Sequence, residues 1–158
     1  MMKLSKNLSL SEVTYSKTAL RKDIDNTPTD EHIENLKYLA ENVFQPMRDH
    51  FGVPIYISSG YRSPELNKAI GGSPRSFHCH GMALDLDQDG RNKGISNYDV
   101  FYYIHDNLPF TELIWEFGDG INPDWVHVAL ARGRENEKQI KTATKVNGKT
   151  KYKTWDRD

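Results

Sequence analysis

The chain has 158 residues, enough for one domain that buries roughly 70% of the surface its unfolded form exposes. Its composition is that of a globular protein, and a net charge of -1 gives no reason to expect nucleic acid or an anionic membrane as a partner. No apolar run approaches the ~20 residues of a membrane span. A single cysteine, Cys79, excludes an intramolecular disulfide and any zinc site built from paired cysteines.

The first 50 residues are predicted to be mainly helical. Residues 9–13 favour a short helix capped by Ser9 or Ser11, and residues 14–25 are polar and predicted to be irregular. The first ten residues lack the apolar core of ~7–15 residues that a secretory signal needs, so we expect none. Apolar side chains recur every 3.6 positions over residues 30–50, which predicts an amphipathic helix that Pro46 kinks or shortens.

The remaining chain is predicted to alternate between strands and helices. Strands are expected at 53–59, 83–87, 112–117 and 125–130, with helices at 63–70 and 97–107. Two alternating segments around Asn147-Gly148 predict a hairpin within residues 138–155. The fold class is therefore α+β with a mostly antiparallel sheet, in a single domain over 1–158 whose core runs from about 8 to 130.

A possible zinc site is formed by His78, Asp85 and His127. His78 precedes a predicted strand that carries Asp85, and a neighbouring strand would bring His127 against that carboxylate. Two imidazoles and one carboxylate leave the fourth position of a tetrahedral zinc ion open to water, which is typical of catalytic zinc. We therefore expect one zinc ion per chain.

Each of these residues also has a structural interpretation. A histidine in a polar loop is usually a surface residue, and an aspartate before Asp89-Gly90 can simply cap a turn. His80 is a competing ligand, although a contact with a ligand histidine or with substrate is the favoured interpretation. Cys79 is expected to fill space rather than to bind zinc.

Three segments together resemble the zinc D-Ala-D-Ala carboxypeptidase family, the M15 peptidases, which includes bacterial peptidoglycan peptidases and phage endolysins. They are Ser59-Gly60-Tyr61-Arg62-Ser63, the segment from Ser76 to Asp85, and Trp125-Val126-His127. The resemblance runs from about Leu8 to Leu130. It implies the α+β fold shared with lysostaphin-type peptidases and the Hedgehog domain, with His78, Asp85 and His127 as zinc ligands.

The resemblance also implies roles for residues around the metal. Asp124, three positions before the last ligand, is the first choice for general base, although on a regular strand it would face away from His127. Glu116 is the alternative base, and either acid could instead be a solvated group at a strand end. Arg62 is expected to bind an oxyanion or a substrate carboxylate, unless it only ties its loop to the sheet.

Three further residues are expected to contact substrate. Ser76 resembles the substrate-contacting serine of the family but could equally cap a turn. Tyr61 and Trp125 are expected to line the cleft, with core packing as the simpler alternative.

The predicted function is hydrolysis of peptidoglycan stem peptides, either as a D-Ala-D-Ala carboxypeptidase or as an L-Ala-D-Glu endopeptidase of endolysin type. We expect a monomer that is cytoplasmic at synthesis and acts on the cell wall after release, from a phage, a prophage or a bacterium. The alternative is a non-catalytic binding module in which zinc only stabilises the fold. Six lysines between 138 and 153 are interpreted as protection of an exposed edge strand rather than as a wall-binding patch.

Overall fold

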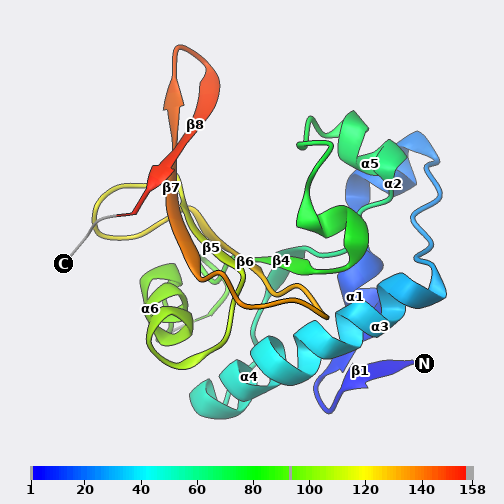
Figure 1. The fold of residues 1–158 in the computed structure, drawn as a ribbon, viewed down its shortest axis with the longest axis horizontal. Helices are drawn as coiled ribbons and strands as arrows, with labels where there is room; N and C mark the ends of the chain where they lie inside the picture. Colours follow the sequence, from blue (N-terminus) through cyan, green and yellow to red (C-terminus); the bar gives the residue numbers. More distant parts are fainter. Residues whose placement is uncertain (1, 93, 156–158) are drawn as a thin grey trace.

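A sheet of six strands, in the order β3-β4-β6-β5-β7-β8, forms the centre of the computed structural model, which describes residues 2–92 and 94–155 (Figure 1). The strands are β3 (Ile57–Ser59), β4 (Ala83–Leu86), β5 (Glu112–Glu116), β6 (Trp125–Ala129), β7 (Gln139–Val146) and β8 (Lys149–Thr154). All neighbours are antiparallel except β5 and β7, which are parallel. The predicted α+β class with a mostly antiparallel sheet is confirmed.

Helices surround this sheet, and a small second sheet pairs β1 (Lys3–Ser5) with β2 (Leu8–Ser9). The helices are α1 (Leu10–Thr14), α2 (Lys17–Lys22), α3 (Asp30–Leu39), α4 (Gln45–Phe51), α5 (Pro64–Ala69) and α6 (Asn97–Asn107), with a 3₁₀ turn, η2 (Phe77–His80). The prediction of an irregular segment at 14–25 is wrong over α2. The Ser16 side chain accepts a hydrogen bond from the amide of Ala19 and so caps a helix that has no apolar stripe.

The long helix predicted over 30–50 is present, but its middle is a wide π-helical turn, η1 (Ala40–Phe44), between α3 and α4. Pro46 is the second residue of α4 and has no amide hydrogen to donate to the preceding turn. The helix nevertheless continues past the proline to Phe51. The strand predicted at 53–59 is shorter than expected and begins only at Ile57.

The two faces of the sheet carry different side chains, one apolar and packed in the core and the other polar. Side chains alternate along each strand, so β4, β6 and β5 each send one set of residues into the core and the other set to the opposite face. The core set packs with α3, η1, α4 and α6, and its sheet members are Leu84, Leu86, Leu113, Trp115, Val126 and Val128. The opposite face carries Asp85, His127 and Glu116, so the core-facing side chains determine which way the polar ones point.

The predicted C-terminal hairpin is also present, formed by β7 and β8 around Asn147 and Gly148. Both turn residues have positive φ, 53° and 77°, as expected for an Asn-Gly turn between antiparallel strands. β8 is the outer strand of the sheet, and the hairpin extends away from the helices (Figure 1). Among the described residues, no helix is both long and apolar enough to cross a membrane.

Candidate metal centre

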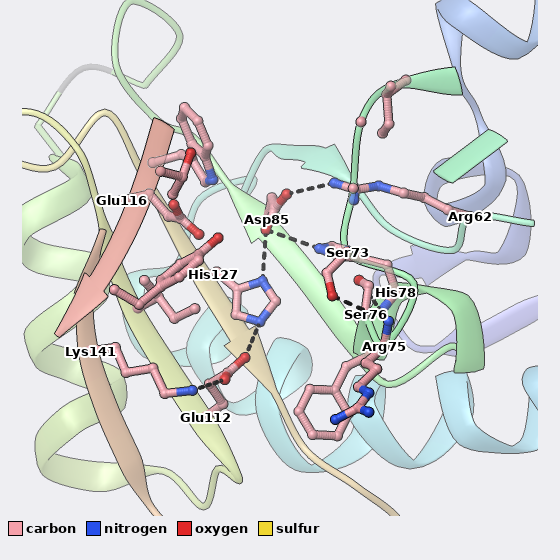
Figure 2. Close-up of a pocket in the computed structure, with 18 of the residues that line it drawn as sticks. Arg62, Ser73, Arg75, Ser76, His78, Asp85, Glu112, Glu116, His127 and Lys141 are labelled. Atoms are coloured by element: carbon pink, nitrogen blue, oxygen red, sulfur yellow. Dashed lines mark hydrogen bonds and ion pairs between the residues drawn. The ribbon is translucent and has the colours of Figure 1, made fainter. Parts of the chain in front are cut away.

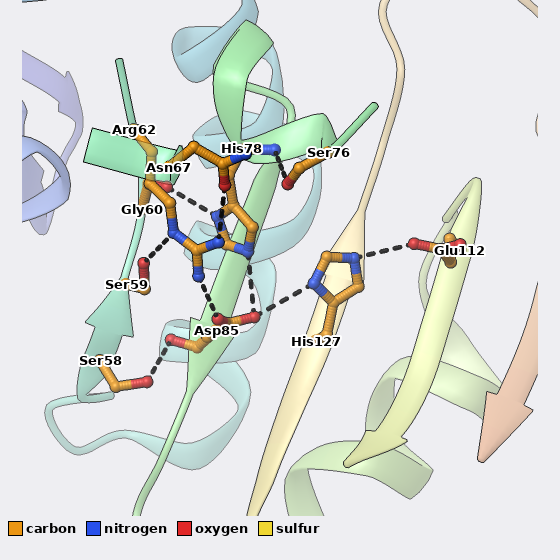
Figure 3. A network of polar contacts seen from close by, with 10 residues as sticks. All are labelled: Ser58, Ser59, Gly60, Arg62, Asn67, Ser76, His78, Asp85, Glu112 and His127. Carbon is orange, nitrogen blue, oxygen red and sulfur yellow. Dashed lines mark hydrogen bonds and ion pairs between the residues drawn. The ribbon is translucent and has the colours of Figure 1, made fainter. Parts of the chain in front are cut away.

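His78, Asp85 and His127 meet on one face of the sheet. Asp85 on β4 and His127 on β6 are direct cross-strand partners, and His78 lies in η2, just before β4. One carboxylate oxygen of Asp85, Oδ1, is 3.2 Å from Nε2 of His78 and 3.1 Å from Nδ1 of His127 (Figure 3). The potential ligand atoms all lie within 4.8 Å of one another, and all three residues are buried.

The second nitrogen of each imidazole is held by a partner outside this cluster. Nδ1 of His78 donates to the carbonyl of Gly60 at 2.7 Å, and Nε2 of His127 is 3.0 Å from a carboxylate oxygen of Glu112. These partners leave Nε2 of His78 and Nδ1 of His127 facing each other across Asp85. Such outer hydrogen bonds fix the tautomer and the orientation of metal-binding histidines. The residues therefore fit a zinc ion, with two nitrogens and one oxygen as donors.

Arg62 holds the carboxylate from the other side. Its Nη2 lies 3.2 Å from Oδ2 of Asp85, while Nε donates to Ser59 and Nη1 donates to Asn67 (Figure 3). With the guanidinium engaged at three nitrogens, the orientation of Asp85 is fixed by residues of β3, α5 and the segment between them. Arg62 also lines the cleft above the site.

The turn that places His78 is built by two neighbouring residues. The hydroxyl of Ser76 accepts a hydrogen bond from the His78 amide at 3.1 Å and so caps η2. Gly81 ends η2 with φ of 71°, and a Cβ atom there would lie 2.6 Å from the carbonyl of His32. Only glycine fits both the left-handed backbone and this close approach to α3.

The charges of the cluster are strongly coupled. Burial would raise the pKa of Asp85, but the adjacent His78 and hydrogen bonds from His127 and His78 hold it far below the ordinary range. Burial lowers the pKa of His78, which is therefore neutral. Burial would also lower the pKa of His127, yet hydrogen bonds to Asp85 and Glu112 raise it to about 9. In the absence of metal, the His127 ring is therefore protonated on both nitrogens. One of them must lose its proton before it can bind a metal ion.

A cleft of about 710 Å³ opens over the cluster, and Glu116 lines it (Figure 2). Glu116 is only 7% exposed and lies at the end of β5, on the same face as His127. Burial, opposed by the charge of His127 and reinforced by the charge of Asp85, raises its pKa to about 7. A carboxyl group with this pKa exchanges protons readily at neutral pH.

The other predicted site residues occupy different places. Asp124 is exposed and is not among the residues that line the cleft. Its amide donates to the carbonyl of Glu116, which places it immediately before β6, where the alternation of side chains directs it away from His127. Trp125 lines the cleft and packs against Phe117, whereas Tyr61 is 4% exposed, belongs to the core and does not line the cleft.

His80 and Cys79 lie outside the metal cluster. The expectation that His78 and His80 share a face assumed an extended segment, but η2 is a 3₁₀ turn, in which positions two apart diverge. His80 is exposed and its ring lies near that of His32, with centroids 6.5 Å apart. Cys79 is partly buried and its thiol pKa is raised by burial, so it is not a ready thiolate.

Sequence reasoning missed a second carboxylate, Glu112, and its partner Lys141. Nζ of Lys141 lies 2.7 Å from Glu112, and together with the hydrogen bond from His127 it lowers the Glu112 pKa to about 2 against the effect of burial (Figure 2). Glu112 and Glu116 are four positions apart on one strand and therefore share a face, a signal that was present in the sequence. The contact with Lys141 depends on the parallel pairing of β5 and β7, which no local pattern indicated.

A mostly antiparallel sheet with a buried His-Asp-His cluster under an open cleft is the arrangement of a metal-binding protein. Comparison with protein families gives a match to the model for peptidase M15 over residues 6–129. The chain belongs to the peptidase M15 family, a zinc-dependent family, and is thus a metallopeptidase acting on a peptide substrate. No curated protein matches the chain closely enough to be compared with it.

Proposed function

We propose that this metallopeptidase hydrolyses the stem peptides of peptidoglycan, with Glu116 as general base. The observation that carries the catalytic part is the position of Glu116. It is a buried carboxyl group with a pKa of about 7, in the same cleft and on the same sheet face as His78, Asp85 and His127. A protein that needed zinc only to hold its fold would gain nothing from this costly burial of a carboxylate.

Each residue of the site has a defined task in this proposal. His78, Asp85 and His127 would hold zinc, which lowers the pKa of bound water towards ~7 and polarises the scissile carbonyl. Glu116 accepts a proton from the attacking water and delivers it to the amine that leaves. Arg62 keeps Asp85 in place through the ion pair at 3.2 Å.

Glu116 is preferred to Asp124 as the base because of where the two side chains lie. Glu116 lines the cleft, whereas Asp124 is exposed at a strand end and does not line it. The backbone of Asp124 instead forms hydrogen bonds at the start of β6. Its carbonyl accepts a hydrogen bond from the side chain of Asn97 at 2.9 Å.

The choice of peptidoglycan rests on the resemblance of the segments at 59–63, 76–85 and 125–127 to wall peptidases. Two bonds of the stem peptide are candidates, D-Ala-D-Ala and L-Ala-D-Glu. An enzyme of this kind would degrade cell walls for a phage or for a bacterium.

Digestion of purified peptidoglycan by the zinc-reconstituted protein, followed by mass spectrometry, tests the proposal. Release of free D-Ala would identify a carboxypeptidase, and a new D-Glu amino terminus would identify an endopeptidase. The Glu116→Gln variant should bind zinc and release neither product. Zinc binding by the parent without any product would show a non-catalytic zinc-binding module instead.

A further inference from the structure

The hairpin of β7 and β8 forms one wall of the cleft, although it lies beyond residue 129, where the family match ends. Four of its side chains line the cleft, namely Lys141, Lys145, Thr150 and Tyr152. Cross-strand pairing explains why they share a face. Lys145 is opposite Thr150, Ala143 is opposite Tyr152, and positions two apart on a strand point the same way.

Tyr152 is 57% exposed and lines the cleft, with one small residue between it and β5. Glu116, Ala143 and Tyr152 form one row across β5, β7 and β8, so β8 lies about 10 Å from β5. The intervening side chain is only the methyl group of Ala143, over which a tyrosine can extend. Burial raises the pKa of Tyr152, and the negative charges of Glu116, Glu112 and Asp85 raise it further. The phenol therefore keeps its proton and is a hydrogen-bond donor.

Lys145 is one of the cations that line the cleft. Of the other cations that line the cleft, Arg62 pairs with Asp85 and Lys141 pairs with Glu112, whereas Arg75 forms no ion pair among the described residues. Within residues 2–92 and 94–155, Lys145 forms no ion pair. Its side chain is exposed, and its ammonium group donates to Thr150 at 2.9 Å and lies 5.3 Å from the centre of the Phe117 ring, contacts that orient it without neutralising it.

Phe117 is itself held in an unusual conformation. Its φ of 57° is in the left-handed region, which aromatic residues rarely adopt, and its ring packs against Trp125 at 5.3 Å. Phe117 and Trp125 both line the cleft, so an apolar surface lies directly beneath the free ammonium group. An apolar floor beside the unpaired ammonium group of Lys145 and a nearby hydroxyl suits the carboxylate end of a peptide better than a neutral or basic segment.

We propose that Lys145, assisted by Thr150 and Tyr152, forms a subsite on the hairpin that binds a free carboxylate of the substrate peptide. This subsite rests on the proposed peptidase function and specifies which part of the substrate the C-terminal hairpin recognises. In a stem peptide the carboxylate has two possible sources, the terminal D-Ala and the α-carboxylate of the γ-linked D-Glu.

Calorimetric titration of the zinc-loaded protein carrying Glu116→Gln, which should not cut the peptide, tests the subsite. The probes are L-Ala-γ-D-Glu-L-Lys-D-Ala-D-Ala and its versions with one carboxylate or both converted to amides. Lys145→Gln should weaken binding of the parent peptide about tenfold or more. Amidation of the recognised carboxylate should weaken binding to the same extent, and should have no further effect once Lys145 is replaced.

Lys151→Gln is the matched control, because Lys151 is on β8, pairs with Thr144 and belongs to the opposite face of the hairpin. Lys151→Gln should bind all four peptides with the same affinities as the Glu116→Gln protein that carries no lysine substitution. The subsite would be overturned if Lys145→Gln and Lys151→Gln bound the peptides equally well, or if no peptide bound at all. It would also be overturned if amidation still weakened binding after Lys145→Gln, or if Arg75→Gln rather than Lys145→Gln abolished the effect of amidation. Carboxylate-dependent binding without peptide cleavage by the protein with Glu116 would instead overturn the proposed function and leave the subsite standing.

Discussion

Asp85 and His127 are direct partners across β4 and β6, with Oδ1 of the carboxylate 3.1 Å from Nδ1 of the imidazole. Both strands are anchored by core side chains at the alternate positions, so the pair is held by rigid elements rather than by loops. The same cross-strand register places Ile114 opposite His127 and brings Glu112 and Glu116 to either side of it. The register of β4, β6 and β5 therefore fixes two of the three metal ligands, Asp85 and His127, together with the partner of His127 and the proposed base.

Replacing Glu116 with Gln should reduce kcat/KM on a wall peptide by about 10²–10⁴-fold, because the attacking water loses its proton acceptor. Zinc content should be unchanged, since Glu116 is not one of the three ligands. In the parent, kcat/KM should rise with pH through an apparent pKa at or below about 7, because zinc favours the ionised carboxylate. Steady-state kinetics between pH 5 and 8 measure both effects.

Asp124→Asn provides the comparison for that experiment. Because Asp124 is exposed and lies outside the cleft, the variant should keep kcat/KM within about threefold of the parent. A loss as large as that caused by Glu116→Gln would assign the base to Asp124.

Glu112→Gln should weaken zinc binding about 10–100-fold, because the carboxylate that accepts from Nε2 of His127 loses its charge. Competition with a chromogenic chelator measures the affinity. Glu135→Gln, an exposed change with the same chemistry, should have no effect. Equal affinities for both variants would mean that Glu112 does not tune the site.

Zinc binding at pH 7 should release at least about one proton. His127 has a pKa of about 9 in the zinc-free protein and is therefore charged, whereas ligation requires the neutral imidazole. His78 is already neutral, so it contributes none. Calorimetry in buffers of different ionisation enthalpy gives the proton count, and a value near zero would contradict the charge state derived for His127.

The burial of Glu116 should make the free energy of unfolding of the zinc-free protein depend on pH. Its pKa rises from 4.5 to about 7 on folding, so its contribution to stability is fully present below pH 4.5 and is lost as the pH rises through 7. Glu116→Gln removes this penalty and should raise the free energy of unfolding by about 3 kcal/mol relative to the parent at pH 8. Urea unfolding with a chelator at pH 4.5 and pH 8 measures the difference, which should grow with pH; a constant difference would contradict the shift.

The sequence was sufficient for the parts of the site that depend on local patterns. Alternation in the segments at 83–87, 112–117 and 125–130 predicted β4, β5 and β6, and with them the common face of Asp85 and His127. The Asn147-Gly148 turn was likewise predictable, because few other residue pairs adopt its backbone conformation. The same period of two predicts that Asp124 faces away from His127, and Asp124 is exposed just before β6.

Other features depend on pairings between distant segments. The parallel register of β5 and β7 puts Lys141 beside Glu112, and no local periodicity specifies which strands become neighbours. The burial of Glu116, and hence its raised pKa, also depends on the hairpin of β7 and β8 folding next to β5. The π-helical turn before Pro46 is a change in backbone hydrogen bonding, which a side-chain pattern does not encode.

The metal site is tested most directly by an anomalous difference map, at the zinc absorption edge, of crystals grown with zinc. We expect one peak per chain, bonded at ~2.0–2.2 Å to Nε2 of His78, Nδ1 of His127 and the carboxylate of Asp85. A peak bonded to His80 or Cys79, or no peak between β4 and β6, would contradict the proposed centre.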